Sequence, residues 1–244
     1  MQFYQVYLET RGGTHGYTMA HVLSIPGCVC DGKSIKEAVQ SIPCTIRNHI
    51  SWLEKHGEKG ESWEFKLRIK EHIYGVNELG LSGGKVAVFK PDYKFVDEND
   101  AKQYLAIWGH ARNDLLRLTK TLSESQLKFR LNHNKRNVSE IMRHISNADW
   151  WYVSRIVMGL EKEYPDVSQS VPEDTFQHLT ATRKIVLEKL LSISVREKKK
   201  VFVPDYFAKY TDEIWTYRKV WRRLIEHELE HIIEIRKILQ MISC

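Results

Sequence analysis

The stretch that most constrains this chain is residues 221–244, WRRLIEHELEHIIEIRKILQMISC, which has the spacing of an amphipathic helix. From residue 220 on, apolar residues or histidines recur in steps of three or four, which keeps them on one helix face. These residues are Val220, Leu224, His227, His231, Ile235, Ile238 and Ile242. Both histidines are therefore expected to point into the protein interior.

Two buried imidazoles on one helix face need partners, because an unpaired buried polar group costs about 1–3 kcal/mol. A divalent metal is one such partner, since neutral imidazole is a good ligand and i, i+4 spacing lets two rings reach one ion. Neighbouring side chains or water are the alternative partners. The pair alone does not decide between them.

A second helical stretch supplies a third histidine. Its apolar face is formed by Val138, Ile141, Ile145, Ala148, Trp151, Tyr152 and Ile156, with His144 at the centre. Three histidines converging in one bundle are typical of a reactive metal site that keeps an open coordination position. We therefore predict a divalent-metal site formed by His144, His227 and His231, at which sequence alone does not distinguish Zn, Ni, Fe or Mn.

Four stretches after residue 95 have helical spacing, each with a residue that suits a helix start. They span residues 98–122, 138–159, 173–193 and 212–242. Four amphipathic helices of this length pack most simply as a four-helix bundle. The preceding residues are rich in glycine and in turn-forming or charged side chains, which indicates a domain boundary. We place one domain at residues 1–90 and a second, separable one at 95–244.

The first domain has the pattern of a small α/β module. Residues 3–9 and 16–22 are predicted as a hairpin, followed by a turn at 25–28 that ends the sheet. A helix is expected over 34–54, where Ser34 and Glu37 can form a capping box. Strands are expected at 63–74 and 85–89. The predicted fold class is therefore α+β, with a β-β-α-β domain followed by an all-α bundle.

Composition is that of a soluble globular protein, with 42% hydrophobic and 28% charged residues. The first residues lack the pattern of a signal peptide, and no stretch approaches the roughly 20 apolar residues of a membrane span, so we expect a cytoplasmic protein without membrane association. Four cysteines are expected to be reduced thiols, including the Cys28/Cys30 pair. The net charge of +6 is a mild basic excess that is only weak evidence for anionic ligands or nucleic acid, and no nucleic-acid partner is expected.

The segment GYTMAHVLSIPGCVCDGKSIKEAVQSI, residues 16–42, resembles the HicB-like antitoxin domain family. The resemblance covers about 75 residues and rests on Gly16-Tyr17, the turn at 26–28, Gly32 and the helix start at Ser34. Some members of this family neutralise RNA-cleaving toxin partners and carry a DNA-binding segment after the module. A helical bundle follows the module in this chain instead. Packing on its sheet, or forming a homodimer through it, is a second role for such a module.

Two later segments, NKRNVSEIMRHISNADWWYVSRI (134–156) and EIWTYRKVWRRLIEHELEHIIEIRKIL (213–239), resemble the DinB-like family of damage-inducible proteins. That similarity spans about 145 residues. It implies a four-helix bundle with one histidine on the second helix and an HxxxH pair on the last, around a divalent metal. By position these ligands are His144, His227 and His231. Some relatives are metal-dependent S-transferases that activate a low-molecular-weight thiol.

Other chemistries fit the residues less well. Residues 227–231 also match the HExxH helix of zinc proteases, but only 13 residues follow His231 and the further ligands of that class are missing. Glu228 is therefore expected to be a flank or surface charge. A di-iron site would need a second Glu-x-x-His motif. His110, His133 and His178 are expected on the surface or in loops.

The function expected from these observations and from the DinB-like resemblance is a metal-dependent transferase or hydrolase-like enzyme, with thiol S-transfer as its most concrete form. Asp149, Trp151 and Tyr152 are candidates to line its pocket or to brace a ligand. The alternative is a non-catalytic binding protein, in which the first domain recruits a macromolecular partner and the metal is structural.

Overall fold

A computed structural model describes residues 1–11, 17–59, 61–76, 87–160, 174–204 and 213–242. The chain divides into two compact units, each of which combines two segments of sequence. The first unit is Met1–Asp97 with Val201–Arg222, and the second is Glu98–Lys200 with Arg223–Cys244. The second domain expected from the sequence includes residues 201–222, whereas Val201–Arg222 group with the first unit in the structure.

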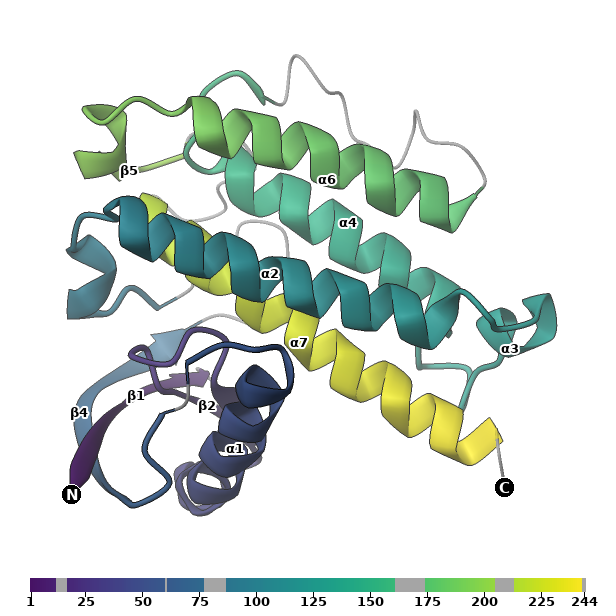
Figure 1. Cartoon of the computed structure of the whole chain (residues 1–244), viewed down its shortest axis with the longest axis horizontal. Helices are drawn as coiled ribbons and strands as arrows, with labels where there is room; N and C mark the ends of the chain where they lie inside the picture. The colour runs from purple at the N-terminus through teal and green to yellow at the C-terminus, as the bar shows by residue number, and fades with distance from the viewer. Residues whose placement is uncertain (12–16, 60, 77–86, 161–173, 205–212, 243–244) are drawn as a thin grey trace. The chain divides into compact units, whose positions relative to one another are not determined.

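The first unit is built on a four-stranded sheet with the order β3-β2-β1-β4 (Figure 1). Its strands are β1 (Gln2–Arg11), β2 (Thr18–His21), β3 (Val29–Gly32) and β4 (Phe65–Val76). β1 pairs antiparallel with β2 and parallel with β4, and β2 pairs antiparallel with β3. Parallel pairing of β1 with β4 requires a crossover, which α1 (Ile35–Lys55) supplies.

Helix α1 packs against the sheet through one apolar face, formed by Ala38, Ile42, Ile46, Ile50 and Leu53. Ser34 caps its start as predicted, because the Ser34 side chain accepts a hydrogen bond from the Glu37 amide at 3.2 Å, whereas the Glu37 carboxylate accepts one from the Lys33 amide at 2.9 Å. Gly32 allows the close approach of strand and helix. A Cβ built at that position would lie 2.5 Å from the Ala38 backbone nitrogen.

Two expectations for this unit were wrong. The turn at residues 25–28 does not end the sheet, because β3 follows it at once and pairs with β2. Residues 87–89, the described part of the strand expected at 85–89, are not a strand. Phe89 and Ala87 instead pack with Tyr7 and Val76 in a buried apolar cluster. Most of the expected hairpin turn, residues 12–16, lies outside the described part of the chain.

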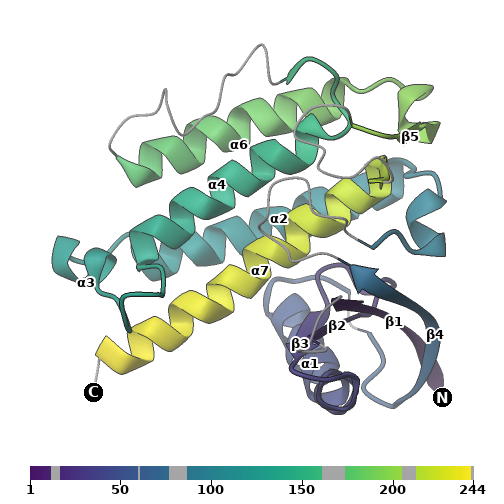
Figure 2. The ribbon, with the colours of Figure 1, turned by 180° about the vertical axis from the view of Figure 1, so that it is seen from behind.

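The second unit contains the long helices α2 (Glu98–Thr119), α4 (Val138–Ser154) and α6 (Thr175–Ser192). The greater part of α7 (Tyr217–Ile242) completes it, and the four helices lie side by side (Figures 1 and 2). A short helix, α3 (Glu124–Lys128), precedes α4, and a 3-10 turn, η2 (Glu197–Lys199), follows α6. Fully buried apolar side chains fill the interior of this bundle, among them Leu115, Ile141, Ile145, Val186, Leu224 and Ile235.

The start of α7 belongs to the first unit, together with η1 (Lys90–Tyr93) and the two-stranded sheet of β5 (Val201–Phe202) and β6 (Trp215–Thr216). Arg222 makes a two-pronged ion pair with Asp92, with donor–acceptor distances of 3.0 and 2.9 Å. It also donates a hydrogen bond to the Ala87 carbonyl. These buried contacts fix the first turns of α7 against the segment that follows the sheet.

The fold class is α+β, as predicted, and the four predicted helices of the bundle are present. Within the residues that the structure describes, every helix is too short or too polar to cross a bilayer.

Candidate metal centre

The structure brings together the three histidines that the sequence selected. His144 lies in the middle of α4, while His227 and His231 lie one turn apart on α7. The Nε2 atom of His227 is 3.1 Å from Nε2 of His144 and 3.1 Å from Nε2 of His231. The three residues form the group of potential metal ligands found among the described residues, with their donor atoms all within 4.8 Å of one another.

A carboxylate fixes the orientation of one of these rings. Nδ1 of His231 lies 2.8 Å from the Glu234 carboxylate, so this nitrogen carries the ring proton and donates a hydrogen bond to the carboxylate. Nε2 of His231 is then the acceptor nitrogen, with its lone pair directed into the cluster. A carboxylate that orients a ligating histidine in this way is a usual feature of metal sites. The His231/Glu234 spacing of three residues was visible in the sequence, but its role was missed.

Burial keeps His144 and His227 uncharged. It lowers the pKa of His144 to about 3, with further contributions from His231 and Arg136. Burial likewise holds the pKa of His227 well below its ordinary value, and the two neighbouring histidines add to this effect. Both rings are therefore neutral at pH 7, the form in which imidazole binds metals.

The donor set fits a divalent first-row metal. Metal–nitrogen bonds of about 2.0–2.1 Å place neighbouring ligand nitrogens roughly 3.0–3.4 Å apart, and the 3.1 Å separations agree with this spacing. A single proton between two rings cannot satisfy three converging nitrogens, whereas one ion can. Three neutral ligands leave the charge of such an ion uncompensated and leave room for a further ligand.

A buried ion-pair network holds the four helices together beside the histidines. The Glu228 carboxylate accepts hydrogen bonds from Arg112 of α2 at 2.5 Å and from Arg183 of α6 at 2.9 Å. Arg112 also donates to Asp149 of α4 at 3.2 Å. Because Glu228 follows His227 directly, this network fixes the rotation of α7 about its axis and with it the direction of the imidazole.

The expectation that Glu228 is a flank or surface charge was wrong, since its side chain is fully buried. Burial acts to raise the pKa of Glu228, but the charges of Arg112 and Arg183 outweigh it and hold the pKa below its usual value. For Asp149, burial and the charge of Glu228 prevail and raise the pKa. With its carboxylate held by two arginines, Glu228 is not placed as the general base of a protease.

The three residues expected to line the pocket or to brace a ligand have different neighbours. The Tyr152 ring packs edge-on against His227, with centroids 5.7 Å apart, whereas Asp149 contacts Arg112 and Trp151 stacks with Arg155. Tyr152 is therefore the candidate that lies beside a ligand ring.

Two further histidines and three cysteines lie outside the three-histidine cluster. His178 was expected near the surface but is buried in α6, with Nε2 3.2 Å from the Asn147 side-chain oxygen. His133 lines a pocket near His144. Cys28, Cys30 and Cys44 are free thiols.

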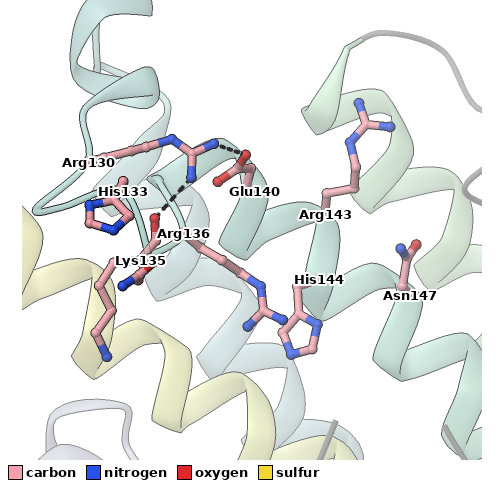
Figure 3. A pocket seen from close by; sticks show the side chains of 9 residues that line it. Arg130, His133, Lys135, Arg136, Glu140, Arg143, His144 and Asn147 are labelled. Carbon is pink, nitrogen blue, oxygen red and sulfur yellow. Dashed lines mark hydrogen bonds and ion pairs between the residues drawn. The ribbon is translucent and has the colours of Figure 1, made fainter. Parts of the chain in front are cut away.

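A cavity of about 450 Å³ opens next to His144 (Figure 3). Four cationic side chains line it, Arg130, Lys135, Arg136 and Arg143, against the single carboxylate of Glu140. Arg130 forms an ion pair with Glu140 and donates to the Lys135 carbonyl at 3.0 Å. The sequence does not reveal this basic lining, because its residues fall in a loop and on two turns of α4 and follow no periodic pattern.

Comparison with known proteins covers the two parts of the chain unequally. No family model matches the chain. The UPF0150 protein Ta0767 of Thermoplasma acidophilum is 46% identical over 44 residues in the N-terminal region. The match covers 18% of this chain and 64% of that protein, slightly less than two thirds of its length.

Two solved four-helix-bundle structures resemble the chain. YfiT from Bacillus subtilis, described as a probable metal-dependent hydrolase with an unusual four-helix bundle topology, has a TM-score of 0.46 at 14% identity. That likeness covers 68% of this chain and 99% of YfiT. TT2238, described as a four-helix bundle protein, has a TM-score of 0.41 at 15% identity, covering 56% and 98% of the two chains.

Proposed function

We propose that this chain is a DinB-like metal-dependent enzyme whose site, formed by His144, His227 and His231, joins a low-molecular-weight thiol through its sulfur to an electrophile. The observation that carries this proposal is the convergence of three histidine Nε2 atoms next to a cavity of about 450 Å³. A cavity of this size suits a small molecule. The compartment expected for this reaction is the cytoplasm.

The chain's own residues have three tasks in this reaction. The histidines bind the ion, Glu234 orients His231, and the network around Glu228 holds α7 in place. A divalent ion held by these residues would stabilise the thiolate, which is the nucleophilic form of sulfur. The thiol proton passes to solvent, the sulfur forms a bond to the electrophilic carbon, and the leaving group departs with the electron pair of the broken bond.

The test compares metal-loaded wild type with His144→Ala. Protein reconstituted separately with Zn, Ni, Fe(II) or Mn is incubated with a panel of cellular thiols and a chromogenic electrophile, and conjugate formation is measured. We expect conjugation with at least one metal and its loss in His144→Ala, whereas His110→Ala, a histidine of α2 outside the cluster, should retain it.

The competing function is a binding protein in which the metal is structural and the N-terminal unit recruits a macromolecule. This second function is supported by the 44 residues that are 46% identical to a UPF0150 protein, because they lie in the N-terminal unit. The coordination shell separates the two proposals, because a structural ion is closed by protein ligands whereas a reactive one keeps an exchangeable position. No conjugation with any thiol, together with four protein ligands in the X-ray absorption spectrum, would establish the binding protein.

A further inference from the structure

The cavity beside His144 carries an excess of positive charge that the metal site itself does not need. Lys135 and Arg136 are exposed residues of the loop that precedes α4. Within the described part of the chain, their side chains have no hydrogen-bond or ion-pair partner. Figure 3 shows the Arg136 guanidinium extending toward the His144 imidazole, whereas Arg143 points away from it.

The positive charge reaches the cluster itself. Arg136 and Lys135 line the same cavity as His144, and the Arg136 guanidinium lies on the side of the cavity where this ligand is found (Figure 3). A metal held by three neutral imidazoles would add its own charge at the same end of the cavity. An anion in this cavity would therefore be attracted by the ion and by the Arg136 guanidinium, and Lys135 adds a further positive charge to the lining.

We infer that the cavity binds the anionic group, a carboxylate or a phosphate, of the small molecule whose sulfur reacts at the histidine cluster, with Arg136 and Lys135 as its specificity-determining residues. This inference rests on the proposed function. Arg136 can offer two parallel donors to a planar carboxylate or to a phosphate, and Lys135 adds a mobile point charge.

The arrangement favours a small anion over a nucleic acid. Binding to a nucleic-acid backbone usually uses several cations spread along a groove or stripe. In this cavity Arg130 is already paired with Glu140, and the two cations without such partners are neighbours in sequence at one edge of a cavity of about 450 Å³. The space and the charge match one or two anionic groups.

The experiment uses three thiols of similar size and different charge: 3-mercaptopropionate, 2-mercaptoethanol and cysteamine. Binding to the full-length, Co(II)-loaded protein is followed through the sulfur-to-cobalt absorption band. We expect the anionic thiol to bind more tightly than the neutral one, and the cationic thiol to bind most weakly. Arg136→Met should weaken the binding of 3-mercaptopropionate about tenfold, because one charge-assisted hydrogen bond is lost. The affinity for 2-mercaptoethanol should stay unchanged. Lys135→Met should act in the same direction.

The matched control is Lys128→Met, which removes an exposed lysine of α3 that does not line the cavity and should leave the order of affinities intact. Equal affinities for the three thiols in wild type, or an unchanged order in Arg136→Met, would overturn the inference. Displacement of 3-mercaptopropionate by a short oligonucleotide with steep salt dependence would overturn it in favour of nucleic acid.

A second measurement does not depend on the metal. Calorimetric titration of the metal-free protein with succinate and with inorganic phosphate should show binding of at least one of them, weakened in Arg136→Met, and it identifies which anion the cavity prefers. Binding of these anions without any metal uptake would contradict the proposed function and leave the anion site standing. Metal uptake without anion binding, in either the metal-free or the metal-loaded protein, would contradict the anion site and leave the proposed function standing.

Discussion

Glu228 shows how a residue adjacent to a candidate ligand can act through the fold. Its fully buried carboxylate is shared by Arg112 and Arg183, so removing its charge leaves two guanidinium groups without their main partner. Breaking a buried pair in this way costs about 3–5 kcal/mol. We expect Glu228→Gln to lower the unfolding free energy of the metal-free protein by an amount in this range, measured by urea denaturation.

The control is Glu124→Gln, which removes an exposed ion pair with Lys128 and should leave the unfolding free energy unchanged. If both variants unfold at the wild-type urea concentration, the network around Glu228 does not hold the bundle together.

His49 should make the stability of the first unit depend on pH. Its ring is buried in α1, Nε2 lies 2.9 Å from the Pro26 carbonyl, and burial lowers its pKa to about 4. The unfolded chain takes up this proton near pH 6.5, so the stability is complete above that pH and falls as the pH decreases toward 4. Between pH 7.5 and pH 5.0 we expect a loss of about 2 kcal/mol from this group.

His49→Gln retains an N–H donor for the Pro26 carbonyl but does not titrate. Urea denaturation at both pH values should therefore show a smaller decrease in unfolding free energy for His49→Gln than for wild type. Identical decreases would mean that His49 titrates normally in the folded protein.

The sequence predicted the convergence of the three histidines because each follows the periodicity of its own helix. The partners of Glu228 and the lining of the cavity could not be predicted in the same way. Arg112 and Arg183 reach Glu228 from helices 116 and 45 residues away, and no local pattern encodes such a distance. Arg136 lies in a loop, where the direction of a side chain depends on the turns that surround it.

Among the helices, α4 depends on its N-terminal cap. The Asn137 side chain accepts a hydrogen bond from the Glu140 amide at 2.8 Å, and the Glu140 carboxylate accepts one from the Asn137 amide at 3.0 Å. Loss of such a cap costs about 1 kcal/mol. Asn137→Ala should therefore lower the unfolding free energy by about this amount and weaken metal binding slightly, since α4 carries His144.

Asn137→Asp, which retains an acceptor, should restore the stability. Ser123→Ala removes the equivalent cap of α3, a helix without buried residues, and should have little effect on either measurement. Equal effects of Asn137→Ala and Ser123→Ala would show that the cap of α4 has no special importance for the site.

The helices were predicted better than the strands for a physical reason. A helix of 17 or more residues repeats its apolar period several times, whereas β3 has only four residues and directly follows a turn. Such a short strand is stabilised by its pairing with β2, which the local sequence does not reveal. The same applies to residues 87–89, whose apolar side chains suggested a strand but pack as a loop.

For the whole chain, the proposed separation of two domains can be tested by truncation. A protein starting at residue 95 lacks Asp92 and the Ala87 carbonyl, the partners of Arg222, so residues 217–222 should lose their helical structure. The histidines lie further along α7 and should still bind metal. Hydrogen exchange should show fast amide exchange at 217–222 in the truncated protein, and full-length Asp92→Asn should show a weaker form of the same change.

Loss of the metal or of the helical signal in the truncated protein would show that the first unit is needed for the bundle to fold. Retention of slow exchange at 217–222 would show that α7 forms its first turns without Asp92.

The most direct test of the three-histidine metal site is to measure the metal stoichiometry together with the absorption spectrum of the bound metal. Metal-free protein is titrated with Co(II), and the visible absorption bands report the number and type of ligands. We predict one ion per chain with three nitrogen ligands and an exchangeable fourth position. Binding should be lost in His144→Ala, His227→Ala and His231→Ala and retained in His110→Ala. No Co(II) binding, or binding that survives in His227→Ala, would show that the three histidines are not a metal site.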